Sequence, residues 1–404
     1  MFDVSAARAH FPALTRTHRG APVAYLDGPG GTQVPRSVIE AIAEVLTLGV
    51  SNLGGPFDSS QLAERVTREA RMAGADLFGA GDPEEIVFGQ NMTSLTFSLS
   101  RALARTWRPG DRIVVTSLDH DANVTPWRLA AADSGVATDI ARFDTATGRL
   151  DPAAVSELLT DRTRLVAITH ASNALGVIPD VAAICAAARD VGALTYVDAV
   201  HYTPHGVVDV QKTGADFLAA SAYKFHGPHV GLLYGRRDLL EELTAFRVRP
   251  APREGAGKWE TGTQSFESLA GVTAAIDYLA SLGDGDDRRQ RIVEAHRRVA
   301  GHLRSLTEMF LDGLGDHVTL HGPSGLDERT PTFAVTVAGS SPQEVAGSLA
   351  KAGLLVWSGH YYAIEPMTQL GLLDRGGAVR VGFIHTTTRS EVERLLEALE
   401  SLRP

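Results

Sequence analysis

Residues 221–235 read SAYKFHGPHVGLLYG and place Lys224 in a mostly uncharged, glycine-rich stretch. A lysine in such surroundings is poorly solvated, so its amine loses proton affinity and becomes a nucleophile that can form an imine with an aldehyde. Earlier in the chain, Asp198 ends the apolar run of LTYVDAVHYTPH (residues 194–205). Its carboxylate is suited to hold a protonated pyridine nitrogen. Taken separately, the two residues also fit a surface lysine in a turn and an aspartate that caps a helix.

An imine-forming lysine and a carboxylate for a pyridinium nitrogen are the groups that pyridoxal phosphate needs in order to act as an electron sink. We therefore interpret Lys224 and Asp198 together as parts of a pyridoxal phosphate site. A single motif has a high false-positive rate, so this interpretation depends on the residues expected around them.

Short apolar runs alternate with amphipathic stretches between about residue 60 and residue 240, and this alternation predicts βαβ units, a mainly parallel sheet and an α/β domain. Ligands of such sheets bind at the carboxyl ends of the strands, so we expect His120, Ser172, Asn173 and Asp198 to converge on one crevice. The expected strands are 84–89, 111–117, 164–172, 194–200, 216–221 and 230–235, and the expected helices are 93–106, 153–161 and 180–192.

From about residue 285 the pattern changes to that of an α+β domain. We expect a long charged helix over 286–314, short strands at 332–339 and 378–383, and a closing helix over 390–402. The segment 247–263 is rich in glycine, proline and charge, which predicts a loop or linker outside the core.

Composition limits the function. At 404 residues and 44% apolar content, the chain can bury more than one core, so two domains are expected. The net charge of -10 is spread along the sequence, which argues against nucleic acid and anionic membranes and favours small-molecule partners. The chain has no run of 18 apolar residues, and the beginning of the sequence lacks the order of a signal peptide, so we expect a soluble, cytoplasmic protein.

Neither the cysteine nor the histidines predict a metal site. The single cysteine, Cys185, has apolar neighbours at helical spacing and is interpreted as a packing residue. His201 and His205 are separated by a proline, and His226 and His229 lie in a Gly/Pro loop without an obvious third ligand.

A phosphate site is predicted at residues 91–94, between an expected strand and an expected helix, where backbone N–H groups and the helix dipole favour an anion. Thr93 is equally suited to cap that helix. Ser221 and Tyr223 come just before Lys224 and are candidates to donate to the same phosphate, or else fill an ordinary turn.

Four further side chains are candidates for contacts with cofactor or substrate. His120 follows a strand and can lie flat against a cofactor ring. Asn173 and His201 are placed to hydrogen-bond the phenolic oxygen of the ring, although each also fits a satisfied polar residue of the interior. Arg380, in AVRVGFIHTTT (residues 378–388), can grip an α-carboxylate through two parallel hydrogen bonds, which predicts an amino-acid substrate; a surface arginine in a strand is the alternative.

With these residues in hand, the chain resembles the class V aminotransferase family of fold type I pyridoxal phosphate enzymes, in particular its cysteine desulfurase-like branch. The resemblance covers nearly all 404 residues. Several motifs in one order are more specific than any single motif: AYLDGPGGTQVP (24–35), NMTSLT (91–96), LDHDANVTPW (118–127), THASNALG (169–176), YVDAVH (196–201), SAYKFHGP (221–228), KWETGTQS (258–265) and VRVGF (379–383).

The resemblance implies a large domain with a mainly parallel seven-stranded sheet over residues 21–260. A linker helix and a smaller α+β domain follow over 261–404, and residues 1–20 pack with the small domain. It also implies a homodimer with active sites between the subunits. The implied roles are a Schiff base at Lys224, a pyridinium partner at Asp198, ring stacking by His120, phenolate contacts from Asn173 and His201, phosphate contacts from Thr93, Ser221, Tyr223 and the neighbouring subunit's Thr263, and carboxylate binding by Arg380.

The chain departs from the branch at one loop. Desulfurases carry a catalytic cysteine in a pattern like Arg-Thr-Gly-His-His-Cys-Ala, whereas residues 357–363 read Trp-Ser-Gly-His-Tyr-Tyr-Ala. Tyr362 stands where the thiol is expected, and a phenol cannot accept sulfur as a persulfide. Trp357 replaces an arginine, which suggests a larger or more apolar pocket, and Met92 replaces a hydroxyl near the phosphate. Trp357, His360, Tyr361 and Tyr362 are the candidates for lining the substrate pocket.

The sequence therefore predicts a pyridoxal phosphate enzyme acting on an amino acid. We expect β-elimination at the carbon-sulfur bond of a cysteine S-conjugate, with Lys224 moving the α-proton and no active-site thiol. Transamination, epimerisation or decarboxylation with the same anchors is the alternative. A cofactor-binding scaffold without turnover is the third reading, and the presence of Lys224, Asp198 and Arg380 argues against it.

Overall fold

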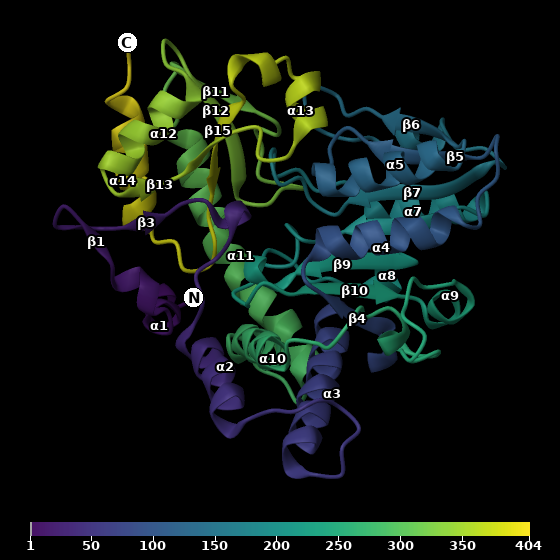
Figure 1. Ribbon diagram of the computed structural model, residues 1–404. Helices are drawn as coiled ribbons and strands as arrows, with labels where there is room; N and C mark the ends of the chain where they lie inside the picture. The colour runs from purple at the N-terminus through teal and green to yellow at the C-terminus, as the bar shows by residue number, and fades with distance from the viewer. Residues whose placement is uncertain (1) are drawn as a thin grey trace.

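A seven-stranded sheet organises the larger part of the molecule (Figure 1). The computed structural model describes residues 2–404. The strand order is β4-β10-β9-β8-β7-β5-β6, and only β10 runs antiparallel to its neighbours, so the expected mainly parallel sheet is confirmed. Its strands are β4 (Ile86–Gly89), β5 (Arg112–Thr116), β6 (Ala137–Ala141), β7 (Thr163–Thr169), β8 (Leu194–Asp198), β9 (Phe217–Ser221) and β10 (Gly231–Gly235).

Both faces of this sheet are covered because its strands place apolar side chains on alternating sides. Val114 and Val166 face one buried cluster, and Val115 and Ala167 face the other. The first cluster includes residues of α3 (Asp58–Phe78), α7 (Val181–Asp190) and α10 (Phe266–Ser281), and the second includes residues of α4 (Met92–Ala104) and α5 (Thr125–Asp133).

A second, four-stranded antiparallel sheet, β11-β12-β15-β14, forms the C-terminal part. The long helix α11 and the closing helix α14 share one apolar core with it, as the pattern from about residue 285 predicts. Its elements are β11 (Val318–His321), β12 (Thr332–Val337), β14 (Trp357–Gly359), β15 (Ala378–Gly382), α11 (Arg288–Asp312), α12 (Pro342–Lys351), α13 (Ile364–Gln369) and α14 (Arg389–Glu400).

The N-terminal segment lies against the C-terminal part. Arg8 pairs with Glu391 at 3.0 Å and donates to the carbonyl of Thr386. The domain limits at residues 20 and 260 stay a prediction. The remaining elements are α1 (Val4–Ala9), β1 (Thr17–His18), β2 (Ala21–Pro22), β3 (Ala24–Tyr25), α2 (Arg36–Leu48), α6 (Pro152–Ser156), α8 (Val210–Thr213), α9 (Arg237–Glu242) and β13 (Leu354–Leu355), with short 3-10 turns between them.

Residues 247–263 form a loop without α-helix or strand, as expected, but the expectation that this loop lies outside the core is wrong at residues 256–259. Ala256 and Trp259 belong to the buried cluster shared with α4 and α5. Lys258 is also buried because its Nζ donates to the carbonyls of Leu240 and Glu241 at 2.9 and 2.7 Å, at the end of α9. The last carbonyls of a helix have no hydrogen-bond partner within the helix and can bind a cation. These hydrogen bonds allow the charged side chain of Lys258 to be buried.

Within residues 2–404, no helix combines the length and apolar character needed to cross a bilayer.

Candidate active site

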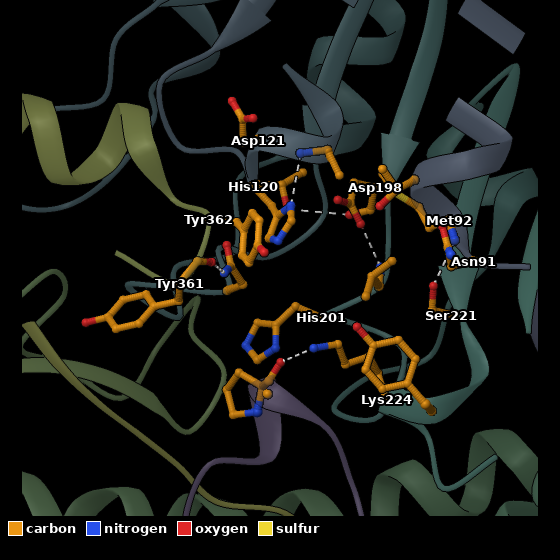
Figure 2. A pocket seen from close by; sticks show the side chains of 18 of the residues that line it. Asn91, Met92, His120, Asp121, Asp198, His201, Ser221, Lys224, Tyr361 and Tyr362 are labelled. Carbon is orange, nitrogen blue, oxygen red and sulfur yellow. Dashed lines mark hydrogen bonds between the residues drawn. The ribbon is translucent and has the colours of Figure 1, made fainter. Parts of the chain in front are cut away.

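A cavity of about 740 Å³ lies at the carboxyl ends of the parallel strands, where β5, β7, β8 and β9 end. Side chains from the large sheet, from the turn after β3 and from the C-terminal part surround it (Figure 2). Thirteen of the predicted site residues line this cavity: Met92, Thr93, His120, Asn173, Asp198, His201, Ser221, Tyr223, Lys224, Trp357, Tyr361, Tyr362 and Arg380.

Three predicted residues do not line it. Ser172 is buried, and its Oγ accepts from the backbone of Leu175 at 3.2 Å instead of facing the crevice, so that expectation is wrong. His360 and Thr263 are also absent from the cavity wall, and Thr263 is exposed in the loop before α10. The role given to Thr263 depends on a second subunit and stays a prediction.

Lys224 is a half-buried amine in the wall of the cavity. Its Nζ donates to the carbonyl of Pro29 and lies 4.6 Å from the centre of the Tyr223 ring. Burial, together with the positive charge of Arg380, lowers the pKa of Lys224 to about 7, while Asp27 and Asp198 act in the opposite direction. The amine therefore has a substantial neutral fraction near neutral pH, as a nucleophile or a base requires.

Asp198 lies at the end of β8, and its Oδ1 accepts from the backbone N–H of Val200 at 2.9 Å. Burial raises the pKa of this carboxyl to about 6, and Lys224 and the Val200 hydrogen bond oppose the shift. A carboxylate buried without a full cationic partner gains from a cation placed beside it. A protonated ring nitrogen would supply that cation.

His120 begins the turn that follows β5. Its Nδ1 accepts from the N–H of Ala122 at 3.0 Å, which fixes the imidazole at the cavity wall. Burial first, and then Lys224 and Arg380, lower the pKa of His120 to about 3, so the ring is neutral at physiological pH. Figure 2 shows His120, Asp198, His201 and Lys224 around one common space.

The predicted anion site corresponds to the beginning of α4. Asn91 caps this helix by accepting from Ser94 N–H at 2.9 Å, so the alternative that Thr93 is the cap is wrong. Ser221 Oγ accepts from the N–H of Met92 at 3.0 Å, which joins the end of β9 to the first turn of α4. Thr93 remains exposed at the cavity, where a helix N-terminus favours a phosphate.

Asn173 and His201 approach the cavity from the ends of β7 and β8. Asn173 Nδ2 donates to the carbonyl of Tyr361 at 3.1 Å, whereas its buried Oδ1 has no partner within the described residues. His201 Nε2 lies 3.0 Å from the hydroxyls of Thr330 and Thr332. An orphaned buried amide oxygen beside the cavity fits a bound group that supplies the missing hydrogen bond.

Arg380 lies in β15 and is 4% exposed. Its guanidinium pairs with Asp27 and stacks over the ring of Tyr361 at 4.7 Å. Asp27 was not among the predicted site residues, although it lies inside the motif AYLDGPGGTQVP. It could have been found only by asking which carboxylate neutralises a buried strand arginine.

Within residues 2–404, no three His, Cys, Asp or Glu side chains gather as a metal-binding group. Cys185 lies on α7, buried, and burial raises the pKa of its thiol to about 11. It does not line the cavity.

A half-buried amine with a lowered pKa, a carboxylate at the end of the neighbouring parallel strand, a neutral imidazole and a helix N-terminus meet at one edge of a doubly covered sheet. This fold and this site define a pyridoxal phosphate-dependent enzyme of fold type I. Residues 24–395 match the model of the family described as Aminotransferase class-V, and the chain belongs to that family.

Relatives agree with this assignment. The chain is 30% identical to a protein named cysteine desulfurase from Pectobacterium carotovorum subsp. carotovorum (strain PC1), over 99% of this chain and 98% of the relative. It is 32% identical to the aminotransferase-like protein FGM3 of Gibberella zeae, with coverage of 99% and 98%. The apo structure of cysteine desulfurase from Thermococcus onnurineus NA1 superimposes with a TM-score of 0.87 at 28% identity, covering 98% of this chain and 97% of that one.

Proposed function

We propose that the protein is a carbon-sulfur lyase that cleaves cysteine S-conjugates by β-elimination. The observation that carries this proposal is the absence of a thiol from the cavity: Tyr362 replaces the cysteine of the desulfurase pattern, and Cys185, the one cysteine, is buried on α7. An enzyme without a sulfur acceptor can still release sulfur on the leaving group of the substrate. The products are then pyruvate, ammonia and a thiol.

In the proposed reaction, each of the predicted site residues has a separate role. Arg380 binds the α-carboxylate of the amino acid, because a guanidinium offers it charge-assisted hydrogen bonds. Lys224 accepts the α-proton, for which a pKa of about 7 is well matched to neutral conditions. When bound, the cofactor would supply an electron sink. Asp198 would hold its ring nitrogen, His120 would lie against its ring, Asn173 and His201 would hydrogen-bond its phenolic oxygen, and Thr93, Ser221 and Tyr223 would bind its phosphate.

We also propose that the enzyme is a homodimer. Exposed apolar side chains gather on α2 and on the segment that leads to α3, including Leu46, Leu48 and Phe57, and such a group is typical of a protein interface. Thr263 lies outside the cavity of its own chain and is available to a neighbouring one. Sedimentation of wild type and of a Leu46→Glu/Leu48→Glu variant tests this: a dimer that the double variant dissociates is expected, and a monomeric wild type contradicts it.

The lyase proposal is tested by incubating the holoenzyme with a set of cysteine S-conjugates. Release of pyruvate and free thiol in equal amounts is expected, and Lys224→Ala should abolish it while leaving the fold intact by circular dichroism. Accumulation of a pyridoxamine absorbance, or an inverted or decarboxylated amino acid without thiol release, would point to the alternative activities and contradict the lyase.

A further inference from the structure

The loop between β14 and α13 contains two consecutive residues with left-handed backbone. Tyr361 has φ 43° and Tyr362 has φ 58°. A non-glycine residue is uncommon in this region and persists only where surrounding contacts hold it. The loop therefore has a defined conformation that its neighbours impose.

Two hydrogen bonds from the large domain impose it. Asn173 Nδ2 donates to the carbonyl of Tyr361 at 3.1 Å, and the N–H of Asp121 donates to the carbonyl of Tyr362 at 2.7 Å. Both donors belong to turns that also carry cavity residues. The two hydrogen bonds thus connect this loop of the C-terminal part to the large domain, which contains most of the predicted cofactor-binding residues.

The left-handed backbone sends the two side chains to different places. Tyr361 is 5% exposed, lies under the guanidinium of Arg380 and points away from Lys224 (Figure 2). Tyr362 is 67% exposed, and its ring stacks on His120 with centroids 5.5 Å apart and planes 19° apart. A phenol ring is thereby presented at the cavity with most of its surface free for a ligand.

Two further aromatic side chains line the cavity. Trp357 is 58% exposed and lines the cavity, and Phe97 of α4 lines it as well. Large aromatic side chains that are exposed at a concave site mark a surface for apolar contact.

No cationic side chain of the cavity wall is free to bind an acidic side chain of the substrate. Its charged residues are three carboxylates and two bases: Asp27, Asp121, Asp198, Lys224 and Arg380. Arg380 is paired with Asp27 and is assigned to the α-carboxylate of the substrate. Lys224 is assigned to the imine with the cofactor and to the transfer of the α-proton. A side chain of the substrate that reaches Tyr362 meets aromatic rings and negative charge, so a carboxylate or sulfonate there is disfavoured.

We infer that the enzyme selects cysteine conjugates whose sulfur carries a planar aromatic group, and that Tyr362 is the specificity-determining residue which stacks on that group. The inference rests on the proposed lyase function. In the reaction the Cα–H bond breaks and its proton passes to Lys224, the Cα–Cβ double bond forms, and the Cβ–S electron pair leaves on sulfur as an arenethiolate. Because an arenethiolate is a stable anion, no acid is needed at the sulfur, and Tyr362 acts by contact alone.

The test compares S-phenylcysteine with S-cyclohexylcysteine, which has a ring of similar size that is not planar. An aromatic pair contributes enough to change kcat/KM by about 2- to 10-fold, so wild type should prefer the phenyl conjugate by at least that factor. Part of the preference comes from the better leaving group and does not depend on residue 362. Tyr362→Phe should therefore keep the whole preference, and Tyr362→Ala should reduce it by about 2- to 10-fold. Phe246→Ala, which truncates an exposed aromatic ring outside the cavity, is the control and should behave as wild type.

A binding measurement separates this inference from the lyase proposal. Homophenylalanine and its cyclohexyl counterpart replace the sulfur by a methylene group and cannot be cleaved, so calorimetric Kd values on the holoenzyme report recognition alone. Tighter binding of homophenylalanine that Tyr362→Ala removes supports the inference even where no conjugate is cleaved. Equal binding of the two analogues, or a preference that survives Tyr362→Ala, overturns it even where thiol is released.

Discussion

Arg380 and Asp27 form a two-point ion pair inside the active-site cavity, with Nε to Oδ1 at 2.9 Å and Nη2 to Oδ2 at 3.2 Å. The two residues come from opposite ends of the chain. Gly30 makes the pair possible, because a Cβ at that position would lie 1.9 Å from Asp27 Oδ2. The guanidinium is therefore held in a fixed orientation before any substrate carboxylate arrives.

Asp27→Asn should destabilise the protein through this pair. Removing one partner of a buried ion pair leaves the other charge uncompensated and costs about 3 kcal/mol or more. We expect a clear fall in the thermal unfolding midpoint, and a larger stabilisation by homophenylalanine in the variant than in wild type, because the ligand carboxylate replaces the missing charge. Asp316→Asn breaks the exposed pair with Arg403 and should change little. Equal effects of the two substitutions would contradict a buried pair.

Attachment of the cofactor to Lys224 should depend on pH around 7. Only the neutral amine attacks an aldehyde, and burial lowers the pKa of Lys224 to about 7. Adding pyridoxal phosphate to cofactor-free protein, quenching with borohydride and counting labelled peptide should give a rate that rises with pH and levels off above about 7. Arg380→Gln removes a positive charge that lowers this pKa, so its inflection should move to higher pH. An inflection near 10.5, the ordinary value for lysine, would falsify the buried-amine assignment.

The residues that the sequence predicts best are those at strand ends. Lys224, Asp198 and His120 follow apolar runs, and the carboxyl ends of parallel strands meet at one edge, so their convergence follows from local patterns. The edge strand β6 was missed because its residues Ala137–Ile140 are exposed or half-buried, which leaves little apolar signal.

Other parts of the site depend on contacts between distant segments. Nothing near Asp27 in the sequence indicates that it pairs with Arg380. The pairing exists because Asp27, just after β3, forms a bridge with Gly382 of β15 in the fold. The burial of Lys258 is similar, since its partners are two carbonyls at the end of α9. Local composition could not reveal either contact.

A cluster of buried histidines should make the protein lose stability in mild acid. His226, His296 and His385 are buried, and His205 is half-buried with both ring nitrogens shielded from solvent. Phe11 of the N-terminal segment packs against His226 and His385, and His385 Nε2 lies 2.7 Å from the hydroxyl of Tyr278. Burial lowers the pKa of His205 to about 3 and those of His226 and His296 to about 4, and it lowers that of His385 as well.

The direction of the pH effect follows from these pKa values. Below the unfolded value of about 6.5 the unfolded chain binds protons that the folded chain does not, so stability is complete above pH 6.5 and falls as the pH drops towards 4. Urea unfolding midpoints measured from pH 8 to pH 4.5 should show this decline. His205→Gln should make the decline shallower, and His18→Gln, at an exposed position, should leave it unchanged. A midpoint that is flat between pH 6.5 and 5 would contradict the prediction.

The orientation of Tyr362 is open to direct chemical measurement, because the chain has a single cysteine and that cysteine is protected. Cys185 is buried and burial raises the pKa of its thiol to about 11, so wild type should take up no iodoacetamide at neutral pH. Tyr362→Cys places a thiol at an exposed position of the cavity wall and should be alkylated once.

Homophenylalanine bound to the holoenzyme should slow the alkylation, because its ring covers that position. A Leu129→Cys variant, exposed on α5 outside the cavity, should react at the same rate with and without the ligand, and a Tyr362→Cys thiol that behaves in the same way would show that residue 362 does not face the substrate.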